Sequence, residues 1–152
     1  MNLGIDVSKN TLDCCLISDG IFFERQFKNN REGFEQLKSW LHKNGATNAL
    51  HCCCEATGKY YVAAADYLAE SYVMSVENPR KIKGYGNAKL QRSKTDRLDA
   101  RLIAQYCRDM EPRAWQKPSE AQTQLKELNQ YRQRLKAQKA AEQTKLHTAP
   151  DY

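Results

Sequence analysis

Short apolar segments, separated by turn residues, make up the first 27 residues, a pattern typical of β-strands. Within residues 2–7 the larger apolar side chains fall on one face and Asp6 falls on the other. Asp19 and Gly20, between two such segments, are a strong signal for a hairpin turn. We therefore predict an antiparallel meander of three strands, over residues 2–7, 12–18 and 21–27.

The period changes to that of a helix at residue 31, where apolar side chains recur through Phe34, Leu37 and Leu41. A compact apolar run over residues 49–54, which ends at Glu55, predicts a strand that is buried on both faces. The same patterns predict a helix over 59–71, a strand over 72–76, a loop to about residue 93, a helix over 95–108, a linker over 112–118 and a last helix over 119–147, capped by Ser119 and Gln122.

The order of these elements predicts the fold. A right-handed crossover through the helix at 31–44 makes the first and fourth strands parallel neighbours. The result is an α/β fold with a five-stranded mixed sheet flanked by helices, in the ribonuclease-H-like (RNase H-like) order, followed by a C-terminal coiled-coil-like helix. We expect a domain over residues 1–111, a linker over 112–118, the coiled-coil-like helix over 119–147 and a disordered end over 148–152.

The length and composition exclude several classes of protein. A chain of 152 residues suits one domain with an appendage and is too short for a barrel enzyme of about 250 residues. No apolar run approaches the roughly 18 residues that span a membrane, and the first ten residues do not resemble a secretory signal. The six cysteines therefore indicate a reducing cytoplasm and are interpreted as small buried apolar residues.

The net charge of +6 is concentrated in one segment. Residues 79–101 contain eight basic and two acidic side chains, and the rest of the chain is balanced. From charge alone, this segment fits a nucleic-acid-binding surface and a solvated loop equally well. Its tyrosine fits either base stacking or an exposed tight turn. The candidate nucleic-acid-binding residues are Arg80, Lys81, Lys83, Tyr85, Lys89, Arg92, Lys94, Arg97 and Arg101.

Four carboxylates are predicted to converge at one edge of the sheet. Asp6 and Glu55 lie near the carboxyl ends of strands that we expect to be parallel neighbours, where ligand sites of open α/β sheets gather. Asp96 and Asp99 share the apolar face of their helix, whereas its arginines share the opposite face. Acids on an inward face are costly unless they are paired or bind a metal ion.

Each of these acids also fits a simpler structural role, as a helix cap, a salt-bridge partner, a turn acceptor or a strand-end charge. Their convergence favours a site for Mg²⁺ or Mn²⁺, because these ions prefer oxygen ligands. Two such ions about 3.5–4 Å apart activate the attacking oxygen and stabilise the leaving oxygen of a phosphodiester. The sequence therefore predicts metal-dependent chemistry on a nucleic acid.

Four ordered motifs carry a family resemblance: GIDVSK at 4–9, EATGKYY at 55–61, ENPRKIKGYG at 77–86 and SKTDRLDARLIA at 93–104. They resemble the N-terminal domain of DEDD-type insertion-sequence transposases, the group that includes the Piv and MooV DNA invertases and the bridge-RNA-guided recombinases. The resemblance covers residues 1–110 and reaches into the last helix. It implies a RuvC-like domain with Mg²⁺ or Mn²⁺ as cofactor, whose catalytic and metal-binding tetrad is Asp6, Glu55, Asp96 and Asp99.

The resemblance also implies partners. In such proteins a coiled-coil segment follows, then a second domain with a nucleophilic serine, and a structured guide (bridge) RNA pairs with target and donor DNA. We expect DNA and RNA as partners of a prokaryotic, nucleoid-associated protein, and incomplete recombination by a chain without the serine domain. Leu125, Leu128 and Leu135 fit heptad positions of the last helix and favour a homo-oligomer, although Arg132 and Lys139 occupy other positions of the same seam. The alternative is that this helix lies along RNA through Lys136, Lys139 and Lys145.

Two other functions remain open at this point. One is a non-catalytic module that binds RNA or DNA through residues 80–101. The other is a stand-alone RuvC-like junction endonuclease that uses the same four acids. A sugar-kinase or actin-type ATPase begins with a similar GIDVS-like segment, but it needs a duplicated second half that this length excludes.

Overall fold

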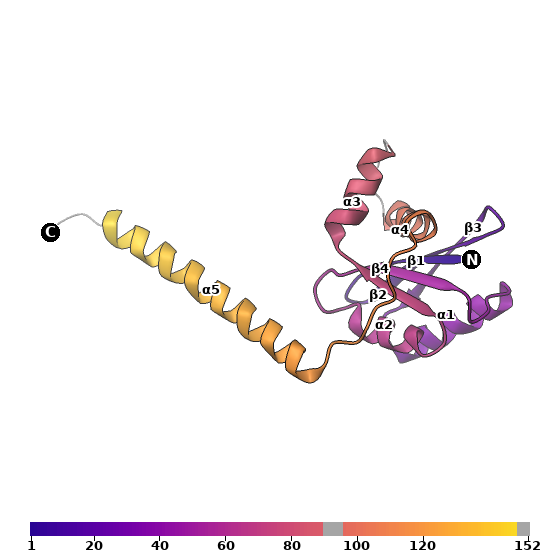
Figure 1. Cartoon of the computed structure of the whole chain (residues 1–152), viewed down its shortest axis with the longest axis horizontal. Coiled ribbons are helices and arrows are strands. Elements are labelled where there is room, and N and C mark those ends of the chain that lie inside the picture. Colours follow the sequence, from indigo (N-terminus) through magenta and orange to yellow (C-terminus); the bar gives the residue numbers. More distant parts are fainter. Residues whose placement is uncertain (90–95, 149–152) are drawn as a thin grey trace. The chain divides into compact units, whose positions relative to one another are not determined.

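The computed structural model describes the backbone of residues 1–89 and 96–148, and the side chains of these residues except 96–98, 126, 147 and 148. The chain divides into two compact units, Met1–Trp115 and Gln116–Tyr152. The first unit carries the sheet and the shorter helices, and the second carries one long helix (Figure 1).

Five strands form a mixed sheet in the order β3-β2-β1-β4-β5 (Figure 1). The strands β1, β2 and β3 are antiparallel neighbours, and β1, β4 and β5 are parallel. The predicted order of the five strands along the chain and the parallel pairing of the first and fourth strands are therefore confirmed. The bounds are β1 (Asn2–Val7), β2 (Thr11–Ser18), β3 (Ile21–Lys28), β4 (His51–Glu55) and β5 (Val73–Glu77).

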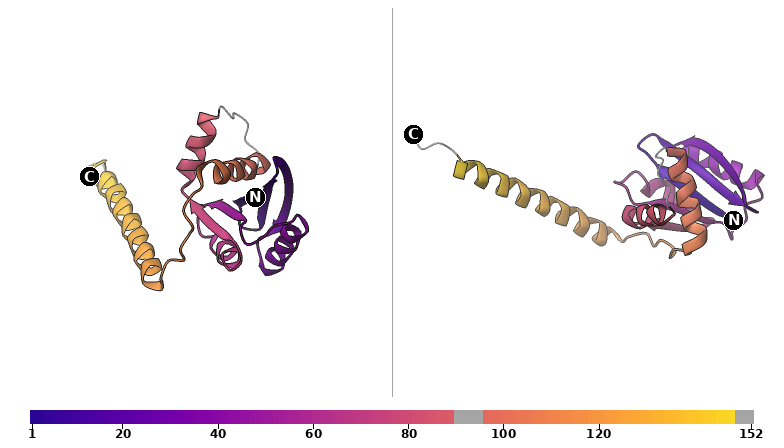
Figure 2. Two further views of the ribbon diagram at one scale, coloured as in Figure 1. Left: turned by 45° about the vertical axis from the view of Figure 1, so that its right-hand side comes forward. Right: turned by 90° about the horizontal axis from the view of Figure 1, so that it is seen from above.

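Different helices cover the two faces of the sheet. One face packs against α1 (Arg31–Lys43) and α2 (Val62–Ala69), and the largest apolar cluster lies there. The other face packs against α4 (Asp96–Met110), which contacts β1, β2 and β4 and lies across the sheet in both views of Figure 2. All six cysteines are buried and none forms a disulfide, which confirms their interpretation as small apolar residues.

Residues 79–88 form a helix, α3 (Pro79–Ala88), where the sequence pattern predicted a loop. Local signals start this helix, because the Asn78 side chain accepts a hydrogen bond from the Arg80 N–H and a proline occupies the first helical position. The glycines of the segment favoured a loop, but a Cβ at Gly86 would meet the Leu102 side chain of α4. The predicted loop is therefore wrong over 79–88, and residues 90–93 lie outside the described part of the chain.

The helix α4 approaches β1 closely because Gly4 has no side chain. A Cβ at Gly4 would fall on backbone atoms of Ala100 and Ala104, which are themselves small and buried. The backbones of the strand and the helix are therefore in direct contact. This contact fixes where the first turns of α4 lie over the sheet.

The segment after α4 is attached to the edge of the sheet. The Trp115 N–H donates a hydrogen bond of 2.6 Å to the Met74 carbonyl of β5, and the Ser75 hydroxyl donates one of 2.8 Å to the Arg113 carbonyl. The Trp115 ring packs against the main apolar cluster. The first compact unit accordingly ends at Trp115.

The second unit contains α5 (Glu120–Thr148), which begins with the predicted capping box. The Ser119 hydroxyl accepts the Gln122 N–H at 3.2 Å, and the Gln122 side chain accepts the Ser119 N–H at 2.9 Å. Its leucines at 125, 128 and 135 are exposed. Of the end that was predicted to be disordered, residues 149–152 lie outside the described part of the chain. No helix among the described residues combines the length and the apolar character needed to cross a membrane.

Replacing Gly4 with Ala is expected to destabilise the fold, because the added methyl group must push α4 away from β1. Overpacking of this kind costs about 1–3 kcal/mol, and a clash with rigid backbone should lie at the upper end of that range. Urea denaturation of the full chain, followed by circular dichroism, measures the loss.

The matched control is Gly84→Ala in α3, since among the described residues no atom outside the backbone of its own helix lies within 4 Å of a Cβ at that position. This variant should keep the stability or raise it by up to about 1 kcal/mol, because Ala favours a helix over Gly. Equal unfolding free energies for the two variants would contradict the direct contact between β1 and α4.

Candidate functional site

Four acidic side chains form a row across one face of the sheet, one from each of four adjacent strands. We name the acid row by its members: Asp13 of β2, Asp6 of β1, Glu55 of β4 and Glu77 of β5. Asp6 lies opposite Asp13, and Glu55 lies beside Glu77 in the parallel pair. The β1–β4 pairing continues to the residues just before Asp6 and Glu55, so these two follow at the same level.

The alternation of side chains places the acid row on the face that α4 covers. Gly4 and Cys53 precede Asp6 and Glu55 by two positions, and both lie against α4. The helix begins near the row and runs away from it, antiparallel to β1. Cys107, near its C-terminal end, contacts the beginnings of β1 and β4 through the Asn2 side chain and the His51 carbonyl. Ala100, about two helix turns before Cys107, lies over Gly4. The first turn of α4 therefore lies toward the carboxyl ends of these strands.

The predicted tetrad is placed as follows. Asp6 and Glu55 are half-buried at neighbouring strand ends. Asp99 is half-buried in the first turn of α4, directly before the alanine that contacts β1. Asp96 is the first residue of α4, and its side chain lies outside the described part of the structure. The fold thus brings Asp6, Glu55 and Asp99 to the same end of the sheet.

The donor chemistry of this region fits a hard divalent cation. The acid row and Asp99 present only carboxylate oxygens, which are the ligands that Mg²⁺ and Mn²⁺ prefer. Among the side chains that the structure describes, no group of three or more His, Cys, Asp or Glu is arranged to hold a metal ion.

Comparison with known proteins identifies the family. Residues 3–149 match the family model DEDD_Tnp_IS110, which is described as a transposase. The chain belongs to this transposase family. Two curated relatives, the pilin gene-inverting proteins of Moraxella bovis and Moraxella lacunata, are each 35% identical over 154 aligned residues, which cover 99% of this chain and 47% of theirs. The chain therefore spans about half the length of these relatives.

A solved structure shows the fold. The T. thermophilus RuvC in complex with Holliday junction substrate superimposes with a TM-score of 0.54 over 75% of this chain and 98% of that chain, at 12% sequence identity. The RNase H-like, RuvC-like sheet with flanking helices is thus confirmed. In this transposase-family chain the acid row lies on the sheet of the RuvC-like unit.

Two acids of the row, Asp13 and Glu77, were missed in the sequence. Asp13 interrupts an apolar strand directly opposite Asp6, and the short connection between β1 and β2 was the available signal for that register. Glu77 ends β5 as Glu55 ends β4, and parallel strands bring such ends together. Glu77 is buried, and its carboxylate accepts a salt bridge of 2.9 Å from the Lys81 Nζ.

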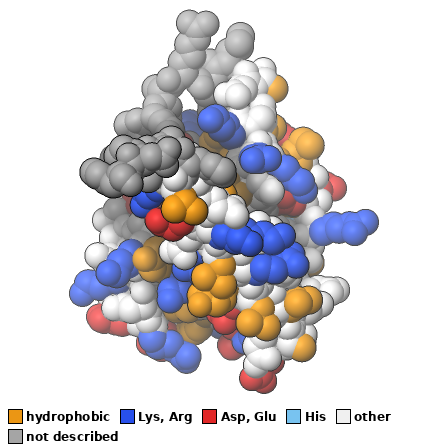
Figure 3. Space-filling view, turned by 90° about the vertical axis from the view of Figure 1, so that its left-hand side faces the viewer, with side chains coloured by type: hydrophobic (Ala, Val, Ile, Leu, Met, Phe, Trp, Pro, Cys, Tyr) orange, Lys and Arg blue, Asp and Glu red, His pale blue; other side chains and the backbone are white. Residues whose placement is uncertain are grey.

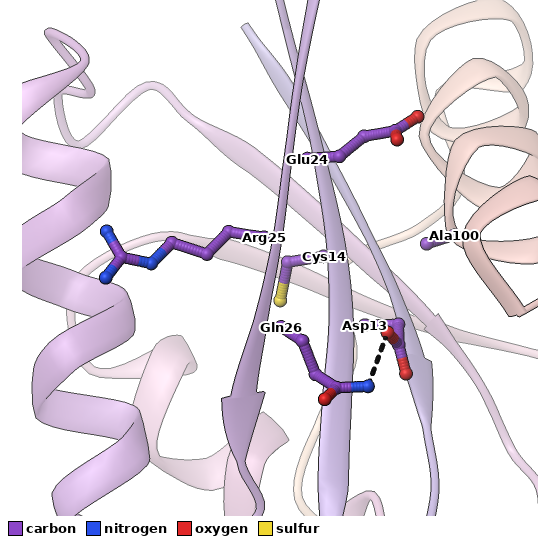
Figure 4. A pocket seen from close by; sticks show the side chains of 6 residues that line it. All are labelled: Asp13, Cys14, Glu24, Arg25, Gln26 and Ala100. Atoms are coloured by element: carbon purple, nitrogen blue, oxygen red, sulfur yellow. Dashed lines mark hydrogen bonds between the residues drawn. The ribbon is translucent and has the colours of Figure 1, made fainter.

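Neutral side chains hold two other members of the row. The Thr57 hydroxyl donates a hydrogen bond of 2.7 Å to Glu55, and the Gln26 amide donates one of 2.9 Å to Asp13. The second bond is drawn in Figure 4, where Asp13 and Gln26 extend toward α4 with Glu24. These residues line a hollow of about 280 Å³ beside Ala100. The acid row thus continues into a polar hollow over β2 and β3.

The predicted nucleic-acid-binding residues differ in what they contact. Arg80 and Lys83 are exposed on α3, whereas Lys81 pairs with Glu77. The sequence placed Arg101 on the outward face of its helix. In the structure its guanidinium lies 3.8 Å from the centre of the Phe22 ring on β3, so it packs on that ring. The remaining members are Arg92 and Lys94, which lie outside the described residues, Arg97, whose side chain also lies outside them, and Tyr85 and Lys89, which join a cluster with α4.

That cluster connects α3 to the C-terminal end of α4. The Asp109 carboxylate accepts hydrogen bonds from Arg108, from Lys89 and from the Tyr85 hydroxyl. The Lys89 Nζ also lies 4.6 Å from the centre of the Tyr85 ring, and this ring packs edge-on against Tyr106. Arg108 above all, with Lys89 and Tyr85, holds the pKa of Asp109 well below its usual range. Tyr85 therefore already has contacts within the protein, through its hydroxyl, through the ring face beside Lys89 and through its edge-on packing with Tyr106.

The Asp109→Asn variant is expected to be less stable than the wild type at neutral pH, and this difference in unfolding free energy should become smaller in acid. Because folding lowers the pKa of this carboxyl, its contribution is complete above the unfolded pKa of about 4 and is lost as the pH falls through the lower folded pKa. The pair lies near the surface, so the expected loss at pH 7 is about 1 kcal/mol.

Urea titrations of both proteins at pH 7 and at pH 3 measure this difference. Asp19→Asn, which removes the same charge in the β2–β3 turn, is the control for the change of charge alone. If the difference in unfolding free energy between Asp109→Asn and the wild type were larger at pH 3 than at pH 7, the assigned role of Asp109 would be contradicted.

Proposed function

We propose that this chain is the RuvC-like domain of a DNA recombinase that cleaves and exchanges strands with a divalent-metal carboxylate tetrad. The acid row at the carboxyl ends of three parallel strands, with Asp99 on the helix packed over them, is the observation that supports it. Membership in the transposase family supports DNA as the substrate. The inversion reaction named for the Moraxella relatives is the kind of rearrangement that we propose for the whole protein.

Asp6, Glu55, Asp96 and Asp99 would hold Mg²⁺ or Mn²⁺. Such an ion supplies Lewis-acid stabilisation of the charge that develops on a phosphodiester. The chain's own groups prepare the site. Thr57 orients Glu55 through its hydroxyl, and Lys81 compensates the buried charge of Glu77. A carboxylate that is held in one orientation loses less conformational entropy when it binds a cation.

We further propose that a structured guide RNA is a partner and that the exposed basic residues contact it and the DNA. In this proposal residues 1–111 form the catalytic domain, 112–118 the linker and 119–147 a coiled-coil-like helix, with a serine-bearing domain of a longer protein completing the reaction. A protein of this kind acts in the cytoplasm, at the nucleoid.

The metal site is tested by isothermal titration calorimetry of Mn²⁺ into the full chain. Asp6→Asn and Asp99→Asn should each weaken binding by tenfold or more, because losing even an outer-sphere partner of a metal site costs about 10–100-fold. Asp19→Asn is the matched control, since its turn position has a φ of 48° that Asn also adopts and lies outside the acid row. Mn²⁺ affinities that stay at the wild-type value in both acid variants would refute the tetrad.

We also propose that α5 associates with a second copy of itself. Leu125, Leu128 and Leu135 leave 61%, 66% and 47% of their surface exposed, which is unfavourable for a helix that stays alone in water. Leu128 and Leu135 share one heptad position, so that both would enter the same seam.

Leu128→Lys combined with Leu135→Lys should shift sedimentation equilibrium toward the monomer by at least about tenfold, because two cations would be buried in the seam. Gln130→Lys combined with Gln133→Lys adds the same charge on the outer side of the helix and should leave the equilibrium unchanged. A wild-type chain that sediments as a monomer at every concentration would rule out this association.

A further inference from the structure

The outward face of α3 carries a basic stripe with a glycine in its middle. Arg80, Lys83, Gly84 and Asn87 recur at helical spacing and are all exposed. We call these four residues the α3 stripe. The opposite face of the helix is occupied differently, because Ile82, Tyr85 and Gly86 pack toward α4.

Gly84 has no role within the described protein that would require a glycine. Its φ is not in the left-handed region, and apart from its own helix no described atom lies within 4 Å of a Cβ placed there. Glycine inside a helix costs about 1 kcal/mol relative to alanine. Gly86, two residues later, is explained by the Leu102 side chain that fills its space. Gly84 therefore lowers the helix stability of α3, and it leaves open space on the exposed face beside Arg80 and Lys83.

The chemistry of the stripe fits a phosphodiester backbone. Arg80 and Lys83 supply positive charge, and Asn87 supplies a neutral donor. A missing side chain between such groups lets a backbone approach closely, as glycines do where a protein contacts phosphates. Lys and Arg side chains are visible in Figure 3, which looks from the side on which α3 lies in Figure 1.

The position of the stripe connects it to the acid row. Glu77 ends β5, and α3 begins two residues later at Pro79. The salt bridge between Glu77 and Lys81 joins the end of the row to the first turn of the helix. A polynucleotide strand that lies along the acid row can therefore continue over α3 without leaving the surface of the first unit.

We propose that the α3 stripe binds the backbone of the DNA strand that passes the acid row, with Gly84 as the point of closest approach. This inference rests on the proposed function for the choice of DNA. It assigns Gly84 and Asn87 to the interface, and it removes Tyr85 from direct base stacking, because that ring serves the contact between α3 and α4.

The test measures binding of the full chain to a fluorescent DNA duplex by anisotropy, in EDTA and over a series of KCl concentrations. Gly84→Ala and Gly84→Leu should weaken binding progressively, by several-fold and then by about tenfold or more, without changing the salt slope, since no charge is lost. Arg80→Ala combined with Lys83→Ala should weaken binding and reduce the slope by roughly 2. Thermal unfolding of the glycine variants should show wild-type or higher stability, which separates lost contact from lost structure.

Lys28→Ala combined with Lys43→Ala removes the same charge from exposed positions on β3 and α1 and is the matched control. Wild-type DNA affinity in both Gly84 variants would overturn the proposal. Losses that occur only with a structured RNA hairpin of equal length would overturn it too, and would assign the stripe to RNA. Because these titrations contain no free divalent metal, they are independent of the Mn²⁺ measurement, and either proposal can fail while the other stands.

Discussion

The direct contact between the backbones of β1 and α4 determines the geometry of the candidate site. It exists because Gly4 has no side chain and because Ala100 and Ala104 present the smallest possible surface to it. A strand and a helix packed at this distance have little freedom to slide, so the first turn of α4 stays at the carboxyl end of β1. Asp99 is carried on that turn. The absence of a side chain at Gly4 therefore sets the position of Asp99, an acid of the proposed metal site.

In the acid row, strand register places four like-charged side chains on neighbouring strands of one sheet face. Adjacent carboxylates repel one another, and the Lys81 ammonium and the donors of Thr57 and Gln26 compensate part of this repulsion. Like charges held close together bind cations more strongly than isolated ones. The same charges would repel a polynucleotide, so in the proposed function the basic side chains on neighbouring α3 would favour the approach of a phosphate strand. The acid row on the sheet and the basic side chains on α3 thus carry opposite charges on adjoining elements, and in the proposed function each is needed for the other.

Much of this arrangement could be predicted from the sequence. Hydrophobic period located every strand to within about two residues, and chain order alone predicted that β1 and β4 are parallel. The helix α3 was missed although Asn78 and Pro79 offered a local start signal, because its glycines argued for a loop. Gly86 instead packs against Leu102 of α4, a tertiary contact that the local pattern does not reveal. Asp13 and Glu77 were missed for a related reason, since membership of the row depends on strand register rather than on the residue itself.

The attachment of Trp115 to Met74 also protects an edge of the sheet. The strand β5 is the last in the sheet order, so its outer side has no neighbouring strand among the described residues. An edge strand with unpaired backbone groups is a template for pairing with another chain. Because the Met74 carbonyl already accepts the Trp115 N–H, the segment after α4 occupies part of this edge and disfavours such pairing.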